Sequence, residues 1–188
     1  KTTFLNKLMN APEMSKSLVI INEFGSIGLD HDLVAHSKED DAVIEMANGC
    51  LCCTIKGDLQ ATLRNAPGRF AREGKTWFDR VVIETTGLAD PAPIIQTIMA
   101  DEKLVNRYRL AEIVTMVDGV NGSDTLDRQP EAVKQAAVAD TILISKADLA
   151  EPDELAALRD RLRALNPTAP IRFHQSDSSD SASLLSQA

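Results

Sequence analysis

All three cysteines of the chain lie in one four-residue window, Cys50-Leu51-Cys52-Cys53. Adjacent cysteines rarely form a disulfide with each other without strain, and a group of three leaves one sulfur over. Deprotonated thiols bind Zn²⁺ or a similar soft ion at about 2.3 Å, and two or three of them leave a coordination position open for transfer. The window therefore predicts a transition-metal site at Cys50, Cys52 and Cys53. The alternative is that the cysteines are small buried apolar side chains.

A phosphate-binding pattern stands at the beginning of the sequence, where Lys1-Thr2-Thr3 enters an amphipathic segment. It matches the end of the motif G-x-x-x-x-G-K-[ST], in which the lysine reaches the β- and γ-phosphates and the next hydroxyl binds Mg²⁺. We therefore predict that Lys1, Thr2 and Thr3 bind nucleotide and that Thr2 is also a Mg²⁺ ligand. The alternative is an ordinary helix start with a threonine cap. The strand and glycine-rich loop that precede this motif do not appear in the sequence, and we expect truncation or disorder to be the reason.

An acidic residue and a glycine follow a strongly apolar segment in Val82-Ile83-Glu84-Thr85-Thr86-Gly87. The spacing suits an acid that acts on Mg²⁺-bound water and a glycine amide that contacts the γ-phosphate without an obstructing side chain. We therefore predict catalytic roles for Glu84 and Gly87, together with Lys1. The alternative is a strand that ends in an ordinary glycine turn.

A third pattern, Ser145-Lys146-Ala147-Asp148, follows another apolar segment. An aspartate accepts hydrogen bonds from both N1–H and the 2-amino group of guanine, while the lysine stem packs over the ring. The pattern therefore favours GTP over ATP, with Ser145, Lys146 and Asp148 as nucleotide ligands. Serine replaces the usual Asn or Thr at the first position, and the alternative is a surface turn.

Alternating strands and helices must position these motifs. Apolar strands between helices indicate an α/β protein with a mostly parallel sheet and helices on both faces. Ligands of such a sheet bind at the carboxyl ends of the strands, which is where these motifs fall. We expect the cysteines in a loop after a short strand. The predicted strands are 17–22, 42–46, 78–84, 112–117, 141–145 and 171–173, and the predicted helices are 2–10, 58–66, 94–100, 131–139 and a last one from 152 to 166.

Composition excludes several classes of protein. The 188 residues are 44% hydrophobic and 26% charged, which fits one α/β domain. No apolar run approaches the roughly 20 residues that cross a membrane. The net charge of −8 opposes binding to nucleic acid, and the cysteine usage fits the cytoplasm. We expect a domain over residues 1–175 and a Ser/Asp-rich, linker-like tail over 176–188.

With these motifs in place, the chain resembles the CobW-like P-loop GTPases along nearly its whole length. The most specific matches are C-x-C-C at 50–53 and E-T-T-G-x-A-D-P at 84–91. The resemblance implies a three-layer P-loop NTPase fold. Asn22-Glu23-Phe24-Gly25 is similar to the first switch segment of the family, which implies that Glu23 binds Mg²⁺ or the thiol-bound metal. The family, which includes proteins of cobalamin biosynthesis, normally carries a C-terminal domain, to which the tail would lead.

The resemblance implies a GTP-hydrolysing metallochaperone that binds Zn²⁺ or Co²⁺ and delivers it to a client metalloprotein under nucleotide control. Leu88 stands where Ras-like enzymes have a glutamine that orients water, so we expect slow intrinsic hydrolysis. One alternative is a metal-storage or sensing module without GTPase cycling. Another is a P-loop kinase for a small substrate, which leaves the cysteines unexplained. The physiological metal, the client and the oligomeric state, for which a dimer is one option, stay open.

Overall fold

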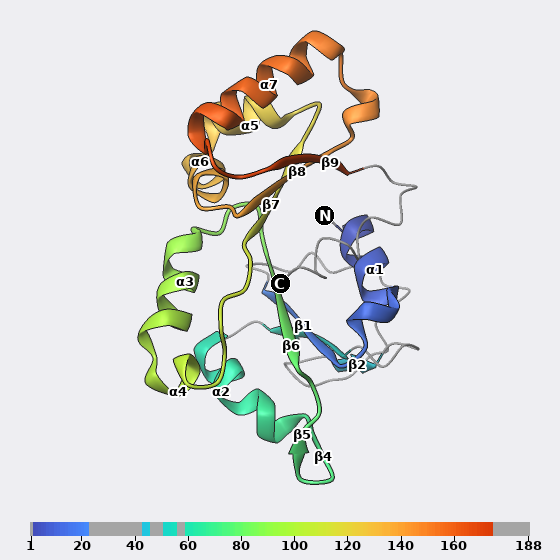
Figure 1. The fold of residues 1–188 in the computed structure, drawn as a ribbon, viewed down its shortest axis with the longest axis vertical. Helices are drawn as coiled ribbons and strands as arrows, with labels where there is room; N and C mark the ends of the chain where they lie inside the picture. Colours follow the sequence, from blue (N-terminus) through green and yellow to red (C-terminus); the bar gives the residue numbers. More distant parts are fainter. Residues whose placement is uncertain (1, 23–42, 46–50, 56–58, 175–188) are drawn as a thin grey trace. The chain divides into compact units, whose positions relative to one another are not determined.

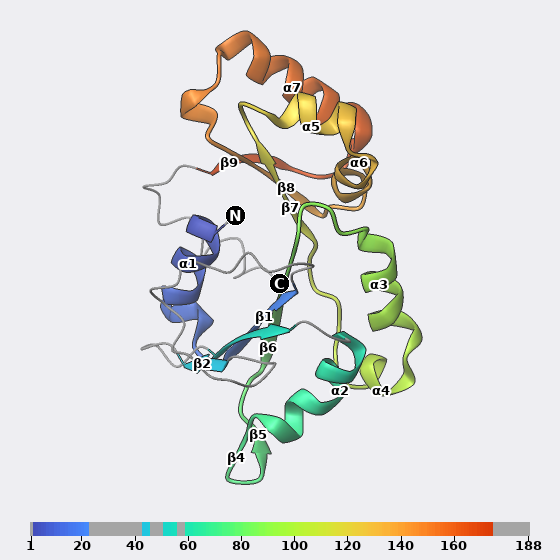
Figure 2. The ribbon, with the colours of Figure 1, turned by 180° about the vertical axis from the view of Figure 1, so that it is seen from behind.

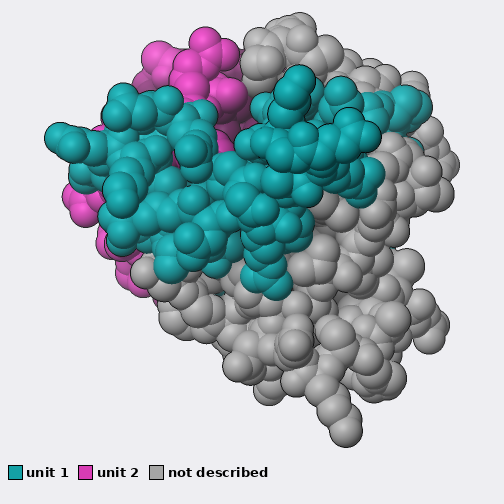
Figure 3. Space-filling view, turned by 90° about the horizontal axis from the view of Figure 1, so that it is seen from below, with its two compact units in different colours: residues 1–86, 100–107 teal, residues 87–99, 108–188 magenta. Residues whose placement is uncertain are grey.

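The computed structural model describes residues 2–22, 43–45, 51–55 and 59–174. The chain forms two compact units, which Figure 3 shows in different colours. The first unit comprises residues 1–86 and 100–107, and the second comprises residues 87–99 and 108–188. No helix in these described ranges is long and apolar enough to cross a membrane.

The first unit is built on a four-stranded sheet with the order β2-β3-β1-β6. The central strand β1 (Ser17–Asn22) runs parallel to β3 (Leu51–Ile55) and to β6 (Arg80–Thr85), whereas β2 (Val43–Glu45) is an antiparallel edge strand. Residues 17–21 of β1 are all buried, as expected for an apolar strand covered on both faces. Figures 1 and 2 show α1 (Thr2–Asn10) and α2 (Leu59–Arg69) on opposite sides of this sheet.

The helices of the first unit follow the apolar periodicity of the sequence, with one difference. The predicted break at Pro67 is wrong, because α2 continues through this proline to Arg69. A proline removes only one hydrogen bond donor, and the Phe70 amide still donates to the Ala66 carbonyl oxygen at 2.9 Å. The other elements of this unit are α1 (Thr2–Asn10), the 3₁₀ turn η1 (Pro12–Met14), α2 (Leu59–Arg69), the hairpin β4 (Ala71–Arg72) and β5 (Lys75–Thr76), and α4 (Glu102–Val105).

Asp101 lies in the interior of the first unit, although it begins the charged run Asp101-Glu102-Lys103. Its carboxylate pairs with Arg64 at 2.5 Å, accepts a hydrogen bond from Gln60 at 2.6 Å and caps α4 through the Lys103 and Leu104 amides. Burial opposes the charge, but these hydrogen bonds outweigh it and hold the pKa of Asp101 below its usual value. The carboxylate therefore joins α2 to α4.

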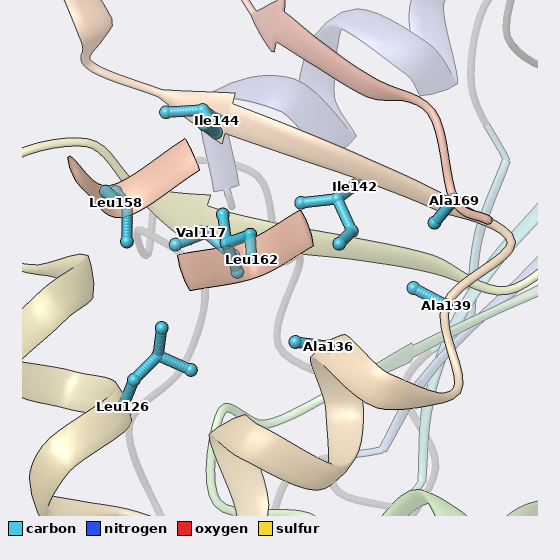
Figure 4. Packing of buried hydrophobic residues seen from close by; sticks show 9 residues of the cluster. All are labelled: Val117, Leu126, Ala136, Ala139, Ile142, Ile144, Leu158, Leu162 and Ala169. Carbon is cyan, nitrogen blue, oxygen red and sulfur yellow. The ribbon is translucent and has the colours of Figure 1, made fainter. Parts of the chain in front are cut away.

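The second unit contains the parallel sheet β7-β8-β9. Helices α5, α6 and α7 pack against one face of this sheet (Figures 1 and 4). Figure 4 shows Ile142 and Ile144 of β8 beside Leu158 and Leu162 of α7 in the shared apolar core. The elements are α3 (Pro91–Ala100), β7 (Val114–Asp118), α5 (Gly122–Arg128), α6 (Pro130–Ala137), β8 (Thr141–Ser145), the 3₁₀ turn η3 (Ala147–Leu149), α7 (Pro152–Leu165) and β9 (Ile171–His174).

Asn166 fixes the end of α6 beneath this core. Its side-chain amide donates to the carbonyl oxygens of Ala136, Ala137 and Ala139 at 2.8–3.2 Å. Its Oδ1 accepts hydrogen bonds from Thr168 and from the Ala169 amide. One buried side chain therefore satisfies carbonyls that the end of α6 leaves without a partner.

The α/β class and the mostly parallel pairing of strands are confirmed, and so is every helix and strand that the sequence predicted, with small shifts in their ends. The prediction omitted β3, where it expected a loop, and also the short elements α4, α5 and the β4–β5 hairpin. The predicted domain limits at 175 and 176 lie where the described residues end, so they stay a prediction.

Candidate functional site

Several of the predicted site residues lie outside the part of the chain that the structure describes. These are Lys1, Glu23 and Cys50. For four others the backbone is described but the side chain is not, namely Thr2 and Thr3 in the first turn of α1 and Cys52 and Cys53 in β3. Their predicted roles stay predictions.

The second half of the predicted cysteine loop is a strand, so the expectation of a loop is wrong there. The backbone of Cys52 pairs with Val19 of β1 and with Ile44 of β2. The residues from Leu51 to Ile55 are apolar or β-branched, and β3 has a strand on each side with which it forms hydrogen bonds. Among the side chains that the structure describes, which do not include those of the cysteine motif, no three His, Cys, Asp or Glu residues group as metal ligands.

Glu84 lies near the carboxyl end of β6, and Gly87 follows shortly after the end of this strand. Glu84 pairs in register with Ile21 of β1 and is half-buried. Strand β6 ends at Thr85, and Gly87 and Leu88 form an exposed turn, with 67% of the Leu88 side chain accessible. The carboxylate therefore stands at the end of a parallel strand, where ligands bind in sheets of this kind.

Residues 87–90 are attached to α6. The side-chain amide of Gln135 donates to the carbonyl oxygens of Ala89 at 2.7 Å and of Gly87 at 3.3 Å. Asp90 forms an ion pair with Lys134 at 2.5 Å and also accepts a hydrogen bond from the Ala92 amide in the first turn of α3. The hydrogen bond from Lys134 holds the pKa of Asp90 below its usual value, and Asp90 in turn raises the pKa of Lys134.

The Ser145–Asp148 pattern forms a tight turn at the end of β8. Lys146 has a left-handed backbone with φ of 55°, which is uncommon for a residue other than glycine. Its Nζ lies 2.6 Å from Oδ2 of Asp118, the last residue of the adjacent strand. Ser145 donates its hydroxyl to the Val117 carbonyl oxygen at 3.3 Å. Asp148 lies in η3, exposed to solvent.

Asp118 both caps a turn and contacts the predicted nucleotide-binding lysine. Its Oδ1 accepts hydrogen bonds from the amides of Val120 and Asn121, which cap the turn after β7. Partial burial opposes its charge, but hydrogen bonds from Lys146, Asn121 and Val120 prevail and lower the pKa of Asp118. The ionised carboxylate therefore holds the lysine beside the turn at neutral pH.

Gly119 lies against the backbone of the same turn. Its amide donates to the Ser145 carbonyl oxygen at 2.7 Å. A Cβ atom at this position would lie 2.9 Å from that oxygen, a distance that real Cβ atoms essentially never show, and 3.2 Å from the Lys146 carbonyl oxygen, which is also tight. Only glycine therefore allows β7 and the Ser145–Asp148 turn to come this close.

We expect the substitution Gly119→Ala to damage the turn. The added methyl group meets backbone rather than a flexible side chain, so the turn must move, and overpacking of this kind costs about 1–3 kcal/mol. The variant should melt at a lower temperature and bind GTP more weakly, as measured by thermal unfolding and by nucleotide titration. Gly68→Ala is the control, because a Cβ at Gly68 has no atom within 4 Å. Unchanged GTP binding by Gly119→Ala would contradict the prediction.

The sequence alone did not reveal all the contacts of this site. The contact of Asp118 with the turn has a signal in the strand order, since adjacent parallel strands place Asp118 opposite Ser145. Lys134 and Gln135 had no such signal, because they are 44 to 48 residues away from the segment they bind.

Comparisons with known proteins match most of this chain. A family model described as "CobW/HypB/UreG, nucleotide-binding domain" matches residues 1–173. The zinc chaperone YjiA of Escherichia coli is 36% identical over 171 residues, which are 91% of this chain and 52% of that protein. The zinc-regulated GTPase metalloprotein activator 1 of Schizosaccharomyces pombe is 31% identical over 179 residues, covering 91% of this chain and 42% of that protein.

The fold also matches a solved structure. A crystal structure of a Zn(II)-bound triple mutant of the YjiA GTPase, with one glutamate and two cysteines replaced by alanine, superposes with a TM-score of 0.74 at 33% identity. The match covers 93% of this chain and 53% of that chain. The chain therefore has the P-loop GTPase fold and spans about half the length of the proteins it matches.

Proposed function

The chain belongs to the CobW/HypB/UreG family of nucleotide-binding domains, and on that premise we propose that it is the GTPase part of a metallochaperone. In this proposal GTP binding and hydrolysis control the uptake of a transition metal and its delivery to a client metalloprotein. The observation that carries the proposal is the turn at Ser145–Asp148, in which Asp118 and Gly119 hold a guanine-type recognition motif at the end of a parallel strand.

The guanine base is recognised by Asp148, whose carboxylate accepts from N1–H and the 2-amino group. Lys146 packs its stem over the ring while Asp118 holds its ammonium group. An adenine has no hydrogen on N1 and no 2-amino group, so the same carboxylate rejects ATP. The exposed position of Asp148 supports this role, because its oxygens are accessible to a base.

The phosphates are bound at the other end of the nucleotide. Lys1 and Thr3 contact phosphate, and the Gly87 amide contacts the γ-phosphate. The Thr2 hydroxyl and the Glu84 carboxylate are hard oxygen donors, so they fit Mg²⁺, which supplies charge neutralisation of the phosphates when it is bound. Glu84 positions the attacking water, and Leu88 lacks the polar group that would speed this step.

The transported ion is Zn²⁺ or Co²⁺, bound as cargo by the thiolates of Cys50, Cys52 and Cys53 with Glu23 as a further ligand. The names of the relatives from Escherichia coli and Schizosaccharomyces pombe both refer to zinc, which supports Zn²⁺ as the cargo. Strand β3, which carries two of the cysteines, pairs with β1, and β1 ends one residue before Glu23. This backbone pairing supports a coupling between the metal site and the first switch segment.

The client is a metalloprotein, since one relative is named a metalloprotein activator. We place the protein in the cytoplasm, where free thiols stay reduced. The alternative function, metal storage or sensing without a GTPase cycle, has no need for Glu84, Gly87 or Asp148.

The test of the proposal is a Zn²⁺ titration of the full-length protein with and without Mg²⁺-GTP. Coupling between two sites is reciprocal and typically changes affinity by about 5- to 150-fold. We therefore expect the Zn²⁺ dissociation constant to change at least about fivefold on addition of GTP, and the GTP dissociation constant to change by the same factor on addition of Zn²⁺. ATP is the control and should have no effect. Zn²⁺ affinity that is the same with and without GTP would end the coupled model and favour storage.

A further inference from the structure

Helix α6 holds the segment that is expected to sense the γ-phosphate, residues 87–90. Gln135 donates to two carbonyl oxygens of this segment, Ala89 at 2.7 Å and Gly87 at 3.3 Å. Lys134, the preceding residue of α6, binds Asp90 at 2.5 Å. These residues all belong to the second unit, so the contacts lie within one compact part of the chain.

These contacts come from a helix that is hydrogen-bonded to the sheet and packed into the core, whereas the segment itself has no regular secondary structure. The main-chain carbonyl oxygen of Gln135 accepts a 2.7 Å hydrogen bond from Thr115, a buried residue of β7. The next residue, Ala136, is fully buried, and its carbonyl oxygen is bound by Asn166. The Gln135 side chain therefore projects from a helix that is fixed to the sheet and to the core.

A glycine that presents its amide to a phosphate needs such a support. Glycine has more backbone freedom than any other residue, and ordering it costs conformational entropy. A hydrogen bond to the Gly87 carbonyl restricts the backbone rotation of that residue before nucleotide binds. A donor that is oriented in advance stabilises developing phosphate charge better than one that must be ordered by the ligand.

Resting on the proposed function, we infer that Gln135 is a positioning residue for GTP, which orients the Gly87 amide toward the γ-phosphate through its hydrogen bonds to Gly87 and Ala89. GDP lacks the γ-phosphate, so its binding does not depend on Gln135. Lys134 adds to the same effect through Asp90. The Lys134 and Asp90 side chains are 53% and 34% exposed, so salt screens this ion pair. The ion pair therefore contributes less to the orientation of the Gly87 amide than the hydrogen bonds of Gln135 do.

The test is the substitution Gln135→Glu in the full-length protein. Glutamate has the same shape, but it replaces the amide donor by a carboxylate oxygen that repels both carbonyl groups. A net loss of one or two hydrogen bonds corresponds to about tenfold in affinity. We expect a non-hydrolysable GTP analogue to bind about tenfold more weakly, whereas the dissociation constant of GDP stays the same. Lys134→Met should weaken the analogue less and only at low salt.

Thr141→Val is the matched control for stability. Thr141 is buried in β8 of the same unit. Its hydroxyl donates a hydrogen bond to Glu112 at 2.7 Å, and this bond does not involve residues 87–90. This variant should lower the melting temperature and leave the ratio of GTP-analogue to GDP affinity unchanged. The ratio therefore separates a positioning role from a merely structural one.

Four results would overturn the inference. If Gln135→Glu weakens the analogue and GDP equally, or leaves both unchanged, Gln135 does not act on the γ-phosphate contact, while the proposed GTPase function stands. If the variant binds the analogue more tightly, α6 holds Gly87 away from the nucleotide rather than toward it. If the parent protein binds neither guanine nucleotide, the proposed function fails, and the inference fails with it.

Discussion

Replacement of Asp148 by asparagine is expected to weaken GTP binding by about 100-fold, because hydrogen bonds to a charged group contribute about 1.5–3 kcal/mol. Asparagine keeps one acceptor for N1–H but turns an amide donor toward the 2-amino group of guanine, which is itself a donor. Xanthine carries a carbonyl oxygen at that position. The variant should therefore bind xanthosine triphosphate better than the parent does. Competition titrations with the two nucleotides measure both changes.

Asp153→Asn serves as the control for this prediction. Asp153 lies in the first turn of α7, is exposed like Asp148, and loses the same charge when it is replaced. It should leave the affinities for both nucleotides unchanged. The prediction would be contradicted if Asp148→Asn kept the GTP affinity of the parent, because base recognition would then belong to another part of the chain.

The second large effect is expected for the cysteine motif. Cys52→Ser replaces a thiolate by a hydroxyl group, which stays protonated at neutral pH and is a poor ligand for Zn²⁺. Loss of a residue that only hydrogen-bonds to a metal ligand already costs about 10–100-fold in metal affinity, so loss of a direct ligand should cost at least about 100-fold. A titration of the full-length protein against a chelating dye measures the Zn²⁺ dissociation constant.

Affinity, and not the mere presence of metal, decides this second prediction. A triple mutant of the YjiA GTPase that lacks two cysteines and one glutamate is described as Zn(II)-bound in its crystal, so occupancy alone does not assign a ligand. Met14→Leu is the control, because Met14 is a fully buried sulfur-containing residue of the same unit outside the motif. Equal Zn²⁺ affinity of Cys52→Ser and the parent would remove Cys52 from the metal site.

Asp101 shows why a charged run in a sequence does not by itself indicate that every member is exposed. The run from Asp101 to Lys103 has the composition of a solvated surface, yet Asp101 is buried between α2 and α4. Its partners Arg64 and Gln60 are 37 and 41 residues away. A buried charge requires such partners, and only the folded chain brings them together.

Strands and helices were predictable because their hydrogen bonds and apolar periodicity are local or follow a simple pattern. The buried run of β1, the apolar face of α1 and the acid at the end of β6 could all be predicted from the printed residues. Short elements such as α5 were not, since a helix of seven residues has little periodicity of its own and depends on packing by Leu126.

The sequence by itself determined the class of fold, the family and the residue types of the phosphate, guanine and metal motifs, because these depend on residues that are close together in the chain. Tertiary structure alone decided how the motifs are supported. Asp118 meets Lys146 across 28 residues, and Gln135 meets Gly87 across 48. Contacts of this span leave no periodicity in the sequence, and they form only when the packing of the sheet and its helices brings the side chains within hydrogen-bonding distance.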